Sequence, residues 1–263
     1  MDKNALRGKW ALVTGASSGM GVEFARQLAK LGCNLVLVAR RKLRLDELAT
    51  ELTAQHAVAV EAMVEDLSRP DAAVRLCERI KDAKRTVDIL VNNAGFGLHG
   101  DFVTLAWSAQ AEMLSVDIVT LTQLTHLLGR DMAARGSGFI LQVASIGSFQ
   151  ATPTYAVYSA AKAYVLSLGE AIASELKKSG VRVSTLCPGV TATEFHEVAG
   201  QKENFFYRLT VMQPDRVARA GLDGLFAGRP CIVPGWINKL AVWSQRLVPR
   251  RVTTAVAGRS MQA

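Results

Sequence analysis

The chain has 263 residues, of which 49% are hydrophobic and 21% charged, as in an ordinary globular protein with a sizeable core. No apolar run reaches the roughly eighteen residues that a bilayer-crossing helix needs. The net charge of +8 is uneven: the residues after Asp223 include six basic and no acidic side chains, and the rest of the chain carries only +2. This distribution argues against a nucleic-acid-binding face spread over the main body.

Cysteine and histidine spacing argues against a metal site. The four cysteines form no Cys-x-x-Cys pair, and the four histidines lack ligand spacing. We interpret the cysteines as buried free thiols of a reducing compartment. The polar stretch at residues 1–9 contains no apparent signal peptide. We therefore expect a cytoplasmic protein without a bound metal.

A glycine-rich turn follows the first predicted strand, at residues 10–13. The sequence Thr-Gly-Ala-Ser-Ser-Gly-Met-Gly occupies residues 14–21, and apolar residues with helical spacing follow it. Glycines allow a sharp turn and a close approach of the backbone to a pyrophosphate, and the next helix directs its N-terminus at the phosphates. Strand, glycine turn and helix in this order predict a dinucleotide-binding site.

The residues after the second predicted strand, at 35–39, indicate which dinucleotide binds. A fold that prefers NAD carries an acidic residue there, whereas this chain has Arg40 and Arg41. Guanidinium groups match a 2′-phosphate in charge and in bidentate geometry, so we predict NADP(H) rather than NAD(H). We interpret the neighbouring Lys42 and Arg44 as the solvated start of a helix.

Tyr158 and Lys162 form a candidate proton-transfer pair. They are four residues apart and share one face if the segment is helical. A tyrosine ionises near about pH 10, and a neighbouring ammonium lowers that pKa, which suits proton exchange with an alcohol or a ketone at neutral pH. Ser145 follows a predicted buried strand at 139–144, so it can meet the pair at the carboxyl edge of a sheet.

Together these stretches resemble the short-chain dehydrogenase/reductase family, in particular its NADP-dependent ketoacyl and hydroxysteroid reductases. Four motifs occur in the family's order: the turn at 14–21, Asn-Asn-Ala-Gly at 92–95, the set Ser145, Tyr158 and Lys162, and Pro-Gly-x-x-x-Thr at 188–193. The resemblance covers residues 8–235. It implies a single α/β domain with a Rossmann-like, doubly wound parallel sheet of about seven strands and helices on both faces.

The resemblance also implies a function, that of an NADP(H)-dependent oxidoreductase interconverting a secondary alcohol and a ketone. Tyr158 would exchange the hydroxyl proton, and Ser145 would hold the substrate oxygen. Lys162 would lower the pKa of Tyr158 and hold the nicotinamide ribose, so both residues also count as cofactor contacts. The other residues expected at the cofactor are Gly15, Ser17, Ser18, Gly19, Met20, Gly21, Arg40, Arg41, Asp66, Leu67, Asn93, Ala94, Gly95, Pro188, Gly189, Val190, Thr191 and Thr193.

The chain departs from the family at its fourth catalytic position, where Asp117 replaces the usual Asn. Asp117 can still disturb the helix hydrogen bonds locally. Its negative charge near Lys162 is expected to shift the Tyr158 pKa in the wrong direction. The departure keeps a second hypothesis open, that of an NADP(H)-binding regulatory or scaffold protein with little turnover.

Residues 190–213 occupy the position of the family's substrate lid. Their aromatic and apolar side chains favour a bulky hydrophobic substrate, although a loop that caps its own core has the same composition. The predicted helix that contains Tyr158 and Lys162 and continues to Lys178, and the helix that contains Asp117, form a dimer face in the family. We therefore expect a homodimer or a homotetramer, with ordinary burial as the alternative explanation for their apolar residues.

Residues 236–263 form a basic extension beyond the predicted catalytic domain at 1–235. Trp236, Leu240, Trp243 and Leu247 fall on one face if this segment is helical. Such a helix can lie peripherally on a membrane, or it can dock on its own or a partner subunit. We favour docking.

Overall fold

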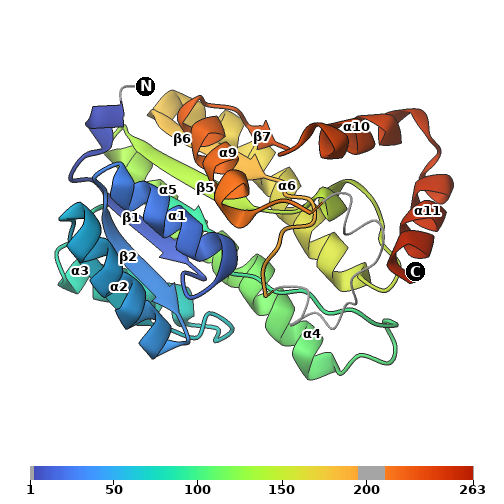
Figure 1. Cartoon of the computed structure of the whole chain (residues 1–263), viewed down its shortest axis with the longest axis horizontal. Coiled ribbons are helices and arrows are strands. Elements are labelled where there is room, and N and C mark those ends of the chain that lie inside the picture. The colour runs from blue at the N-terminus through green and yellow to red at the C-terminus, as the bar shows by residue number, and fades with distance from the viewer. Residues whose placement is uncertain (1–2, 195–210, 263) are drawn as a thin grey trace.

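The computed structural model describes residues 3–194 and 211–262, and its centre is one sheet of seven parallel strands (Figure 1). The spatial order is β3-β2-β1-β4-β5-β6-β7. The strands are β1 (Trp10–Thr14), β2 (Asn34–Ala39), β3 (Val60–Val64), β4 (Val87–Asn92), β5 (Gly138–Val143), β6 (Val181–Leu186) and β7 (Cys231–Ile232). The order reverses beside β1, which pairs with both β2 and β4. Ligands of open α/β sheets bind at such a switch point, outside the carboxyl ends of the strands.

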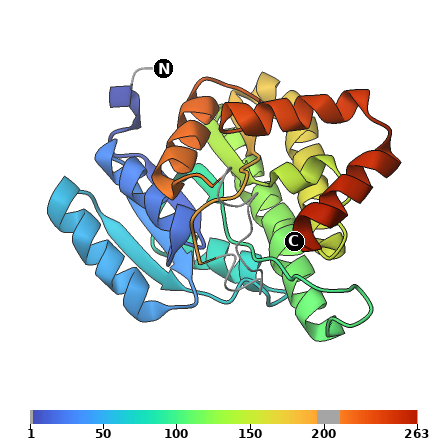
Figure 2. The ribbon, with the colours of Figure 1, turned by 45° about the vertical axis from the view of Figure 1, so that its right-hand side comes forward.

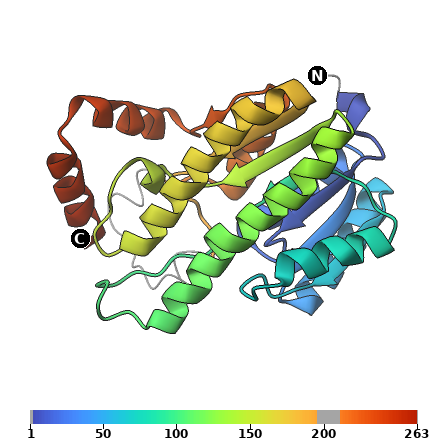
Figure 3. The ribbon, with the colours of Figure 1, turned by 180° about the vertical axis from the view of Figure 1, so that it is seen from behind.

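Helices cover both faces of the sheet, as predicted. One layer contains α1 (Gly19–Lys30), α2 (Lys42–His56) and α9 (Pro214–Phe226). The opposite layer, seen in Figure 3, contains α3 (Ala72–Asp82), α4 (Trp107–Leu114), α5 (Leu121–Ala134) and α6 (Ala156–Leu176). The remaining helical elements are η1 (Lys3–Leu6), η2 (Ser115–Thr120), η3 (Ile146–Phe149), η4 (Lys177–Ser179), α10 (Trp236–Ser244), η5 (Gln245–Leu247) and α11 (Arg250–Gln262).

The strands are continuous apolar runs because both of their faces are buried. Successive side chains of a strand point to opposite faces. In β2, Leu35 and Leu37 pack with the α1 layer, whereas Val36 and Val38 pack with the α3 layer. All four are 0% exposed, so the sheet separates two hydrophobic cores.

A π-helical turn, η2, interrupts the long helix formed by α4 and α5, and Asp117 lies within it. Such turns widen the helix and break its regular hydrogen bonding, and they are frequent at functional sites. The expected local disturbance of the helix at Asp117 is therefore present.

One expectation needs adjustment. Among the cysteines, Cys33 and Cys187 are buried, but Cys77 and Cys231 are only half-buried, so the prediction of uniform burial is wrong. Within residues 3–194 and 211–262, no cluster of three potential metal-ligating side chains occurs. The aromatic residues expected in the lid, at 195–210, lie outside the described residues.

None of the helices in these described ranges is long and apolar enough to span a bilayer.

Candidate active site

The glycine turn between β1 and α1 packs directly on the segment that follows β4. Gly15 has φ of +67°, and a Cβ on this residue would lie 2.9 Å from Cα of Ala94. A Cβ on Gly21 would collide with the carbonyl oxygen of Gly15. The Thr14 hydroxyl oxygen accepts hydrogen bonds from the N–H groups of Asn93 and Ala94, both at 3.0 Å. Two predicted motifs far apart in the chain therefore pack directly on each other.

Asn93 reinforces this contact, because its side-chain amide donates to the Thr14 carbonyl at 2.9 Å. Its neighbour Asn92 lies at the end of β4 and donates to Thr125 at 2.9 Å and to Gln142 at 3.0 Å. The two asparagines thus hold the turn to the sheet and β4 to its neighbours.

Arg41 lies at the start of α2 and reaches back to the glycine turn. Its Nε donates to the Ser17 hydroxyl at 3.0 Å, and Nη1 donates to the Glu194 carboxylate at 2.9 Å. Arg44 donates to the other carboxylate oxygen of Glu194 at 2.5 Å. Hydrogen bonds from Arg44 and Arg41 lower the pKa of Glu194 to about 2, so this carboxylate stays ionised. Arg44 is thus exposed at the start of α2, as expected, and it also pairs with Glu194.

Arg40 points elsewhere than Arg41. It forms an ion pair with Glu112 at 3.0 Å, and 65% of its side chain is exposed. Of the two arginines predicted to select the 2′-phosphate, Arg41 donates a hydrogen bond to the glycine turn, whereas Arg40 pairs with Glu112 of α4.

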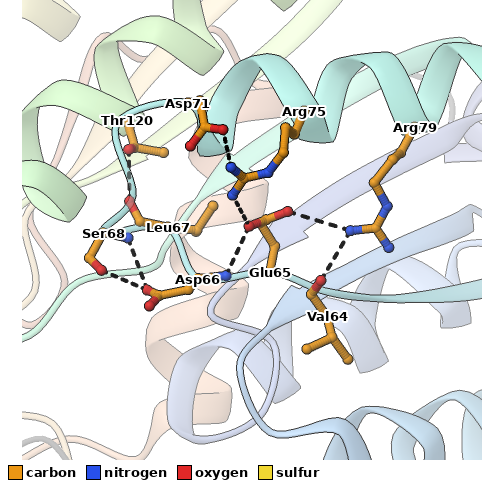
Figure 4. Close-up of polar contacts among 9 residues, drawn as sticks. All are labelled: Val64, Glu65, Asp66, Leu67, Ser68, Asp71, Arg75, Arg79 and Thr120. Atoms are coloured by element: carbon orange, nitrogen blue, oxygen red, sulfur yellow. Dashed lines mark hydrogen bonds and ion pairs between the residues drawn. The ribbon is translucent and has the colours of Figure 1, made fainter.

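Asp66 and Leu67, two of the residues expected at the cofactor, follow β3 (Figure 4). The Asp66 carboxylate accepts from the backbone and hydroxyl of Ser68, at 3.1 and 2.8 Å. Burial opposes ionisation, but these hydrogen bonds and the charges of Arg40 and Arg69 lower the pKa of Asp66. Asp66 therefore stabilises its own turn.

Leu67 ties this loop to the π-helical turn, because its carbonyl accepts from Thr120 at 2.8 Å. Glu65, two residues before Leu67, is 8% exposed and pairs with Arg75 of α3 at 2.6 Å. Asp117 and the loop at 65–68 are therefore held by one connected set of contacts.

Ser145, Tyr158 and Lys162 meet at the carboxyl end of β5. A hydrogen bond joins Tyr158 to Ser145, and Lys162 Nζ lies 5.7 Å from the centre of the Tyr158 ring. Lys162 Nζ also donates to the carbonyl of Val143, the last residue of β5, at 3.2 Å. The amine and the phenol thus lie on the same side of α6, as the four-residue spacing predicted.

Asp117 also belongs to this cluster. Its Oδ1 lies 3.0 Å from Lys162 Nζ, and the two residues are 0% and 4% exposed. Asp117 accepts a further hydrogen bond from the backbone of Phe96. A Cβ on Gly95 would lie 3.0 Å from Lys162 Nζ and would clash with the Asp117 carboxylate. The Asn-Asn-Ala-Gly segment therefore connects the glycine turn to the catalytic cluster.

The electrostatics of the cluster differ from the expectation that Lys162 lowers the pKa of Tyr158. Burial raises the pKa of Tyr158, the Asp117 charge raises it further, and the hydrogen bond with Ser145 opposes both. Burial also raises the pKa of Asp117, against the opposing charge of Lys162. The prediction of a lowered pKa is wrong for this arrangement because Asp117, rather than the phenol, receives the charge of Lys162. The predicted direction of the Asp117 effect is confirmed.

The segment at 188–193 completes the ring around the cluster. The Pro188 carbonyl accepts from the Ile146 backbone at 2.8 Å, directly after Ser145. The Val190 carbonyl accepts a hydrogen bond from the backbone N–H of Met212 at 2.9 Å. The Thr193 side chain lies against Gly19, where an added Cβ would come within 2.9 Å of the Thr193 methyl group. All four sequence motifs therefore converge on one edge of the sheet.

Two aromatic neighbours of Tyr158 were not predicted. The ring of Tyr155 stands edge-on to that of Tyr158 at 5.8 Å, and the ring of His99 lies 5.2 Å from that of Tyr155. Tyr155 precedes Tyr158 by three residues, a spacing that places side chains together on a helix. Nothing in the sequence around His99 indicates its position.

Residues 9–204 match the family described as short chain dehydrogenase. The chain belongs to the short-chain dehydrogenase family. The fold and the convergence of the four motifs agree with this membership.

Among solved structures, this short-chain dehydrogenase is similar to one from Sphingobium yanoikuyae in complex with NADPH. The identity is 33%, the TM-score is 0.81, and the match covers 91% of this chain and 94% of the other. It is also similar to the bulky-bulky ketone specific alcohol dehydrogenase from Comamonas testosteroni. That identity is 28%, the TM-score 0.77, and the coverage 91% and 93%.

A curated relative is the very-long-chain 3-oxoacyl-CoA reductase of Pyrenophora tritici-repentis, 34% identical over 198 residues. The match covers 73% of this chain but 58% of that reductase, so the short-chain dehydrogenase described here spans under two thirds of that relative's length. The comparisons together identify an oxidoreductase of this family.

Proposed function

We propose that this short-chain dehydrogenase is an NADP(H)-dependent oxidoreductase that interconverts a secondary alcohol and a ketone on a bulky hydrophobic substrate. The observation that carries the proposal is the meeting of Tyr158, Ser145 and Lys162 beside the glycine turn. The hydrogen bond between Tyr158 and Ser145 supplies two hydroxyl groups at one point, where they can hold a single substrate oxygen. The bulk of the substrate is inferred from the names of the two relatives that act on bulky ketones and very long acyl chains.

The residues around the glycine turn fit a nicotinamide dinucleotide. Gly15 and Gly21 let the turn pack closely against Asn93 and Ala94. The N-terminus of α1, which follows the turn, suits a pyrophosphate, and Arg41 provides a cation beside Ser17. When bound, the dinucleotide donates or accepts the hydride. Arg41 and Arg44 together form the anion site that favours the 2′-phosphate of NADP(H). The similar structure from Sphingobium, which contains NADPH, supports this choice.

In the reduction, Tyr158 donates its hydroxyl proton to the substrate oxygen, and Ser145 stabilises the charge that grows on that oxygen. A raised Tyr158 pKa keeps the phenol protonated at neutral pH, which suits its role as the acid in ketone reduction. Lys162 and Asp117 are the groups through which the proton can be replaced.

The test is NADPH oxidation over a panel of hydrophobic ketones. Tyr158→Phe should lower turnover by roughly a hundredfold or more while NADPH still binds. Tyr164→Phe is the matched control, because Tyr164 lies on the same helix but its hydroxyl bonds to Thr122 at 3.0 Å, and the residue is 39% exposed. Equal turnover of the wild type and Tyr158→Phe would refute the catalytic role of the phenol.

A second candidate is an NADP(H)-binding regulatory protein with little turnover. The buried ion pair of Asp117 with Lys162 favours this candidate, because the ammonium then pairs with a carboxylate and does not lower the pKa of Tyr158. Saturable NADPH binding with no oxidation of any ketone in the panel would support this candidate. The free cysteines suit a reducing compartment such as the cytoplasm for either function.

A further inference from the structure

The last described segment, residues 236–262, forms a bent arm along one side of the molecule (Figure 2). α10 carries a line of apolar side chains, and η5 continues it. Trp236 is 75% exposed, Leu240 55%, Trp243 56% and Leu247 69%. We call these four residues the outer strip. The first three fall within an arc of roughly 60° on a helix of 100° per residue.

The opposite side of α10 is anchored to the body. Asn238 is 3% exposed and donates to the Pro234 carbonyl at 2.9 Å. Its amide also packs on Gly189, one of the residues predicted to contact the cofactor. Because Asn238 faces inward, the outer strip faces away from the body. α10 thus docks on its own subunit, which is one of the sequence-based hypotheses, but through the side that carries Asn238 and not through the outer strip.

The far end of the arm is also held. In α11, Ala257 is 2% exposed, and Gly258 approaches Pro153 so closely that an added Cβ would lie 3.1 Å from it. Both ends of the arm are thus attached, and the outer strip lies between the two attachments. The outer strip therefore faces away from the body on an arm that is attached to the body at two points.

The positive charge of the arm indicates that its partner is anionic. Residues 224–263 contain no acidic side chain. The exposed basic residues on the arm are Lys239, Arg246, Arg250, Arg251 and Arg259. Lys239 lies roughly 40° beyond Trp243 around the helix, so a cation borders the apolar line. Apolar side chains bordered by cations are complementary to a partner that has an apolar interior beneath an anionic outer layer.

We propose that the outer strip and its basic border dock this protein on the surface of an anionic phospholipid membrane. Tryptophans prefer the boundary between headgroups and acyl chains, and basic residues are attracted to anionic headgroups. A second copy of the chain suits the strip less well. A two-fold interface places a patch against itself, so the same cations would face one another with no acidic partner on the arm.

The experiment is flotation of the full-length protein with vesicles of phosphatidylcholine mixed with phosphatidylserine, compared with phosphatidylcholine alone. We expect the protein to float with the mixed vesicles, to bind pure phosphatidylcholine much more weakly, and to lose binding at high salt. Joint substitution Trp236→Ser with Trp243→Ser should weaken binding roughly tenfold or more. Trp107→Ser is the matched control, because Trp107 is 69% exposed on α4, away from the arm, and its loss should leave binding unchanged.

Folding of each variant is checked by NADPH binding and thermal unfolding. A second variant, Lys239→Gln with Arg246→Gln, tests the border without changing the strip, and it should also weaken binding to the mixed vesicles. Failure of the wild type to float with mixed vesicles overturns the proposal. A dimer in sedimentation that Trp243→Ser converts to a monomer, together with absence of flotation, would instead assign the strip to a subunit interface and equally overturn it.

Discussion

Lys162 Nζ lies 3.0 Å from Oδ1 of Asp117, and the carboxylate is completely shielded from solvent. The second carboxylate oxygen, Oδ2, has no hydrogen-bond partner within the described residues. Buried charges are normally paired and fully hydrogen-bonded, so a half-satisfied carboxylate next to Tyr158 raises the energy of any further negative charge there. The relationship explains why the phenol in this cluster is a proton donor more readily than a base.

Asp117→Asn should therefore shift the pH dependence of alcohol oxidation toward lower pH. Oxidation needs Tyr158 deprotonated, and the Asp117 charge raises the pKa of Tyr158. Removal of that charge lowers this pKa, so the rate rises at a lower pH than in the wild type. The measurement is the pH profile of kcat/KM for oxidation. Asp131→Asn, a change at an exposed position on α5, is the control and should leave the profile unchanged. A shift to higher pH in Asp117→Asn would contradict the prediction.

Arg41→Ala should weaken NADPH binding by roughly ten- to a hundredfold and leave NADH binding nearly unchanged, because the guanidinium serves the 2′-phosphate. Titration of each cofactor by fluorescence provides the measurement. Lys42→Ala removes the same charge from the next residue, whose amine pairs with Asp46 at 2.5 Å, and should change neither affinity. Equal weakening of both cofactors would place Arg41 at a part of the dinucleotide that they share.

Glu194→Gln should tighten NADPH binding by roughly two- to tenfold, since the carboxylate occupies the two guanidinium groups that the 2′-phosphate needs. With its pKa lowered to about 2, Glu194 remains ionised at every pH at which the enzyme is assayed, so the competition does not vary across that range. NADH affinity is the internal control and should stay the same. Weaker NADPH binding in the variant would show that Glu194 supports the cofactor site.

The same ion pairs give Glu194 a defined effect on stability. Its folded-state pKa is below the unfolded value, so the stabilisation is present above the unfolded pKa of about 4.3 and is lost as the pH falls toward about 2. The side chain is 40% exposed, so solvent screening keeps this contribution small. Acid unfolding curves of wild type and Glu194→Gln should therefore converge at the lowest pH and differ only slightly at neutral pH.

Asn92→Ala should lower the free energy of unfolding by about 1–3 kcal/mol, because it leaves a buried acceptor without its hydrogen-bond donor. Asn92 donates to Thr125 and Gln142, which are 6% and 0% exposed. Urea unfolding measures the loss. Gln55→Ala, at an exposed position on α2, is the control and should stay within about 0.5 kcal/mol of the wild type. No loss in Asn92→Ala would mean that the remaining polar groups satisfy one another.

The short-range features of this protein could be predicted from neighbouring residues in the chain. The glycine turn, the strand runs and the four-residue spacing of Tyr158 and Lys162 all depend on neighbours in the chain, so hydrophobic period and residue type suffice to place them. The order of these parts was enough to predict a doubly wound parallel sheet and the edge at which its motifs meet.

The partners of the charged groups, and the side to which the outer strip points, depend on tertiary packing and could not be read from the sequence. Lys162 meets Asp117 across 45 positions, and Glu194 meets Arg41 and Arg44 across 153 and 150. A helical pattern identifies the apolar face around Trp236 and Trp243, but the inward position of Asn238 settles which way that face points. Such contacts depend on how separate elements pack, and no local period in a sequence encodes the packing of distant elements.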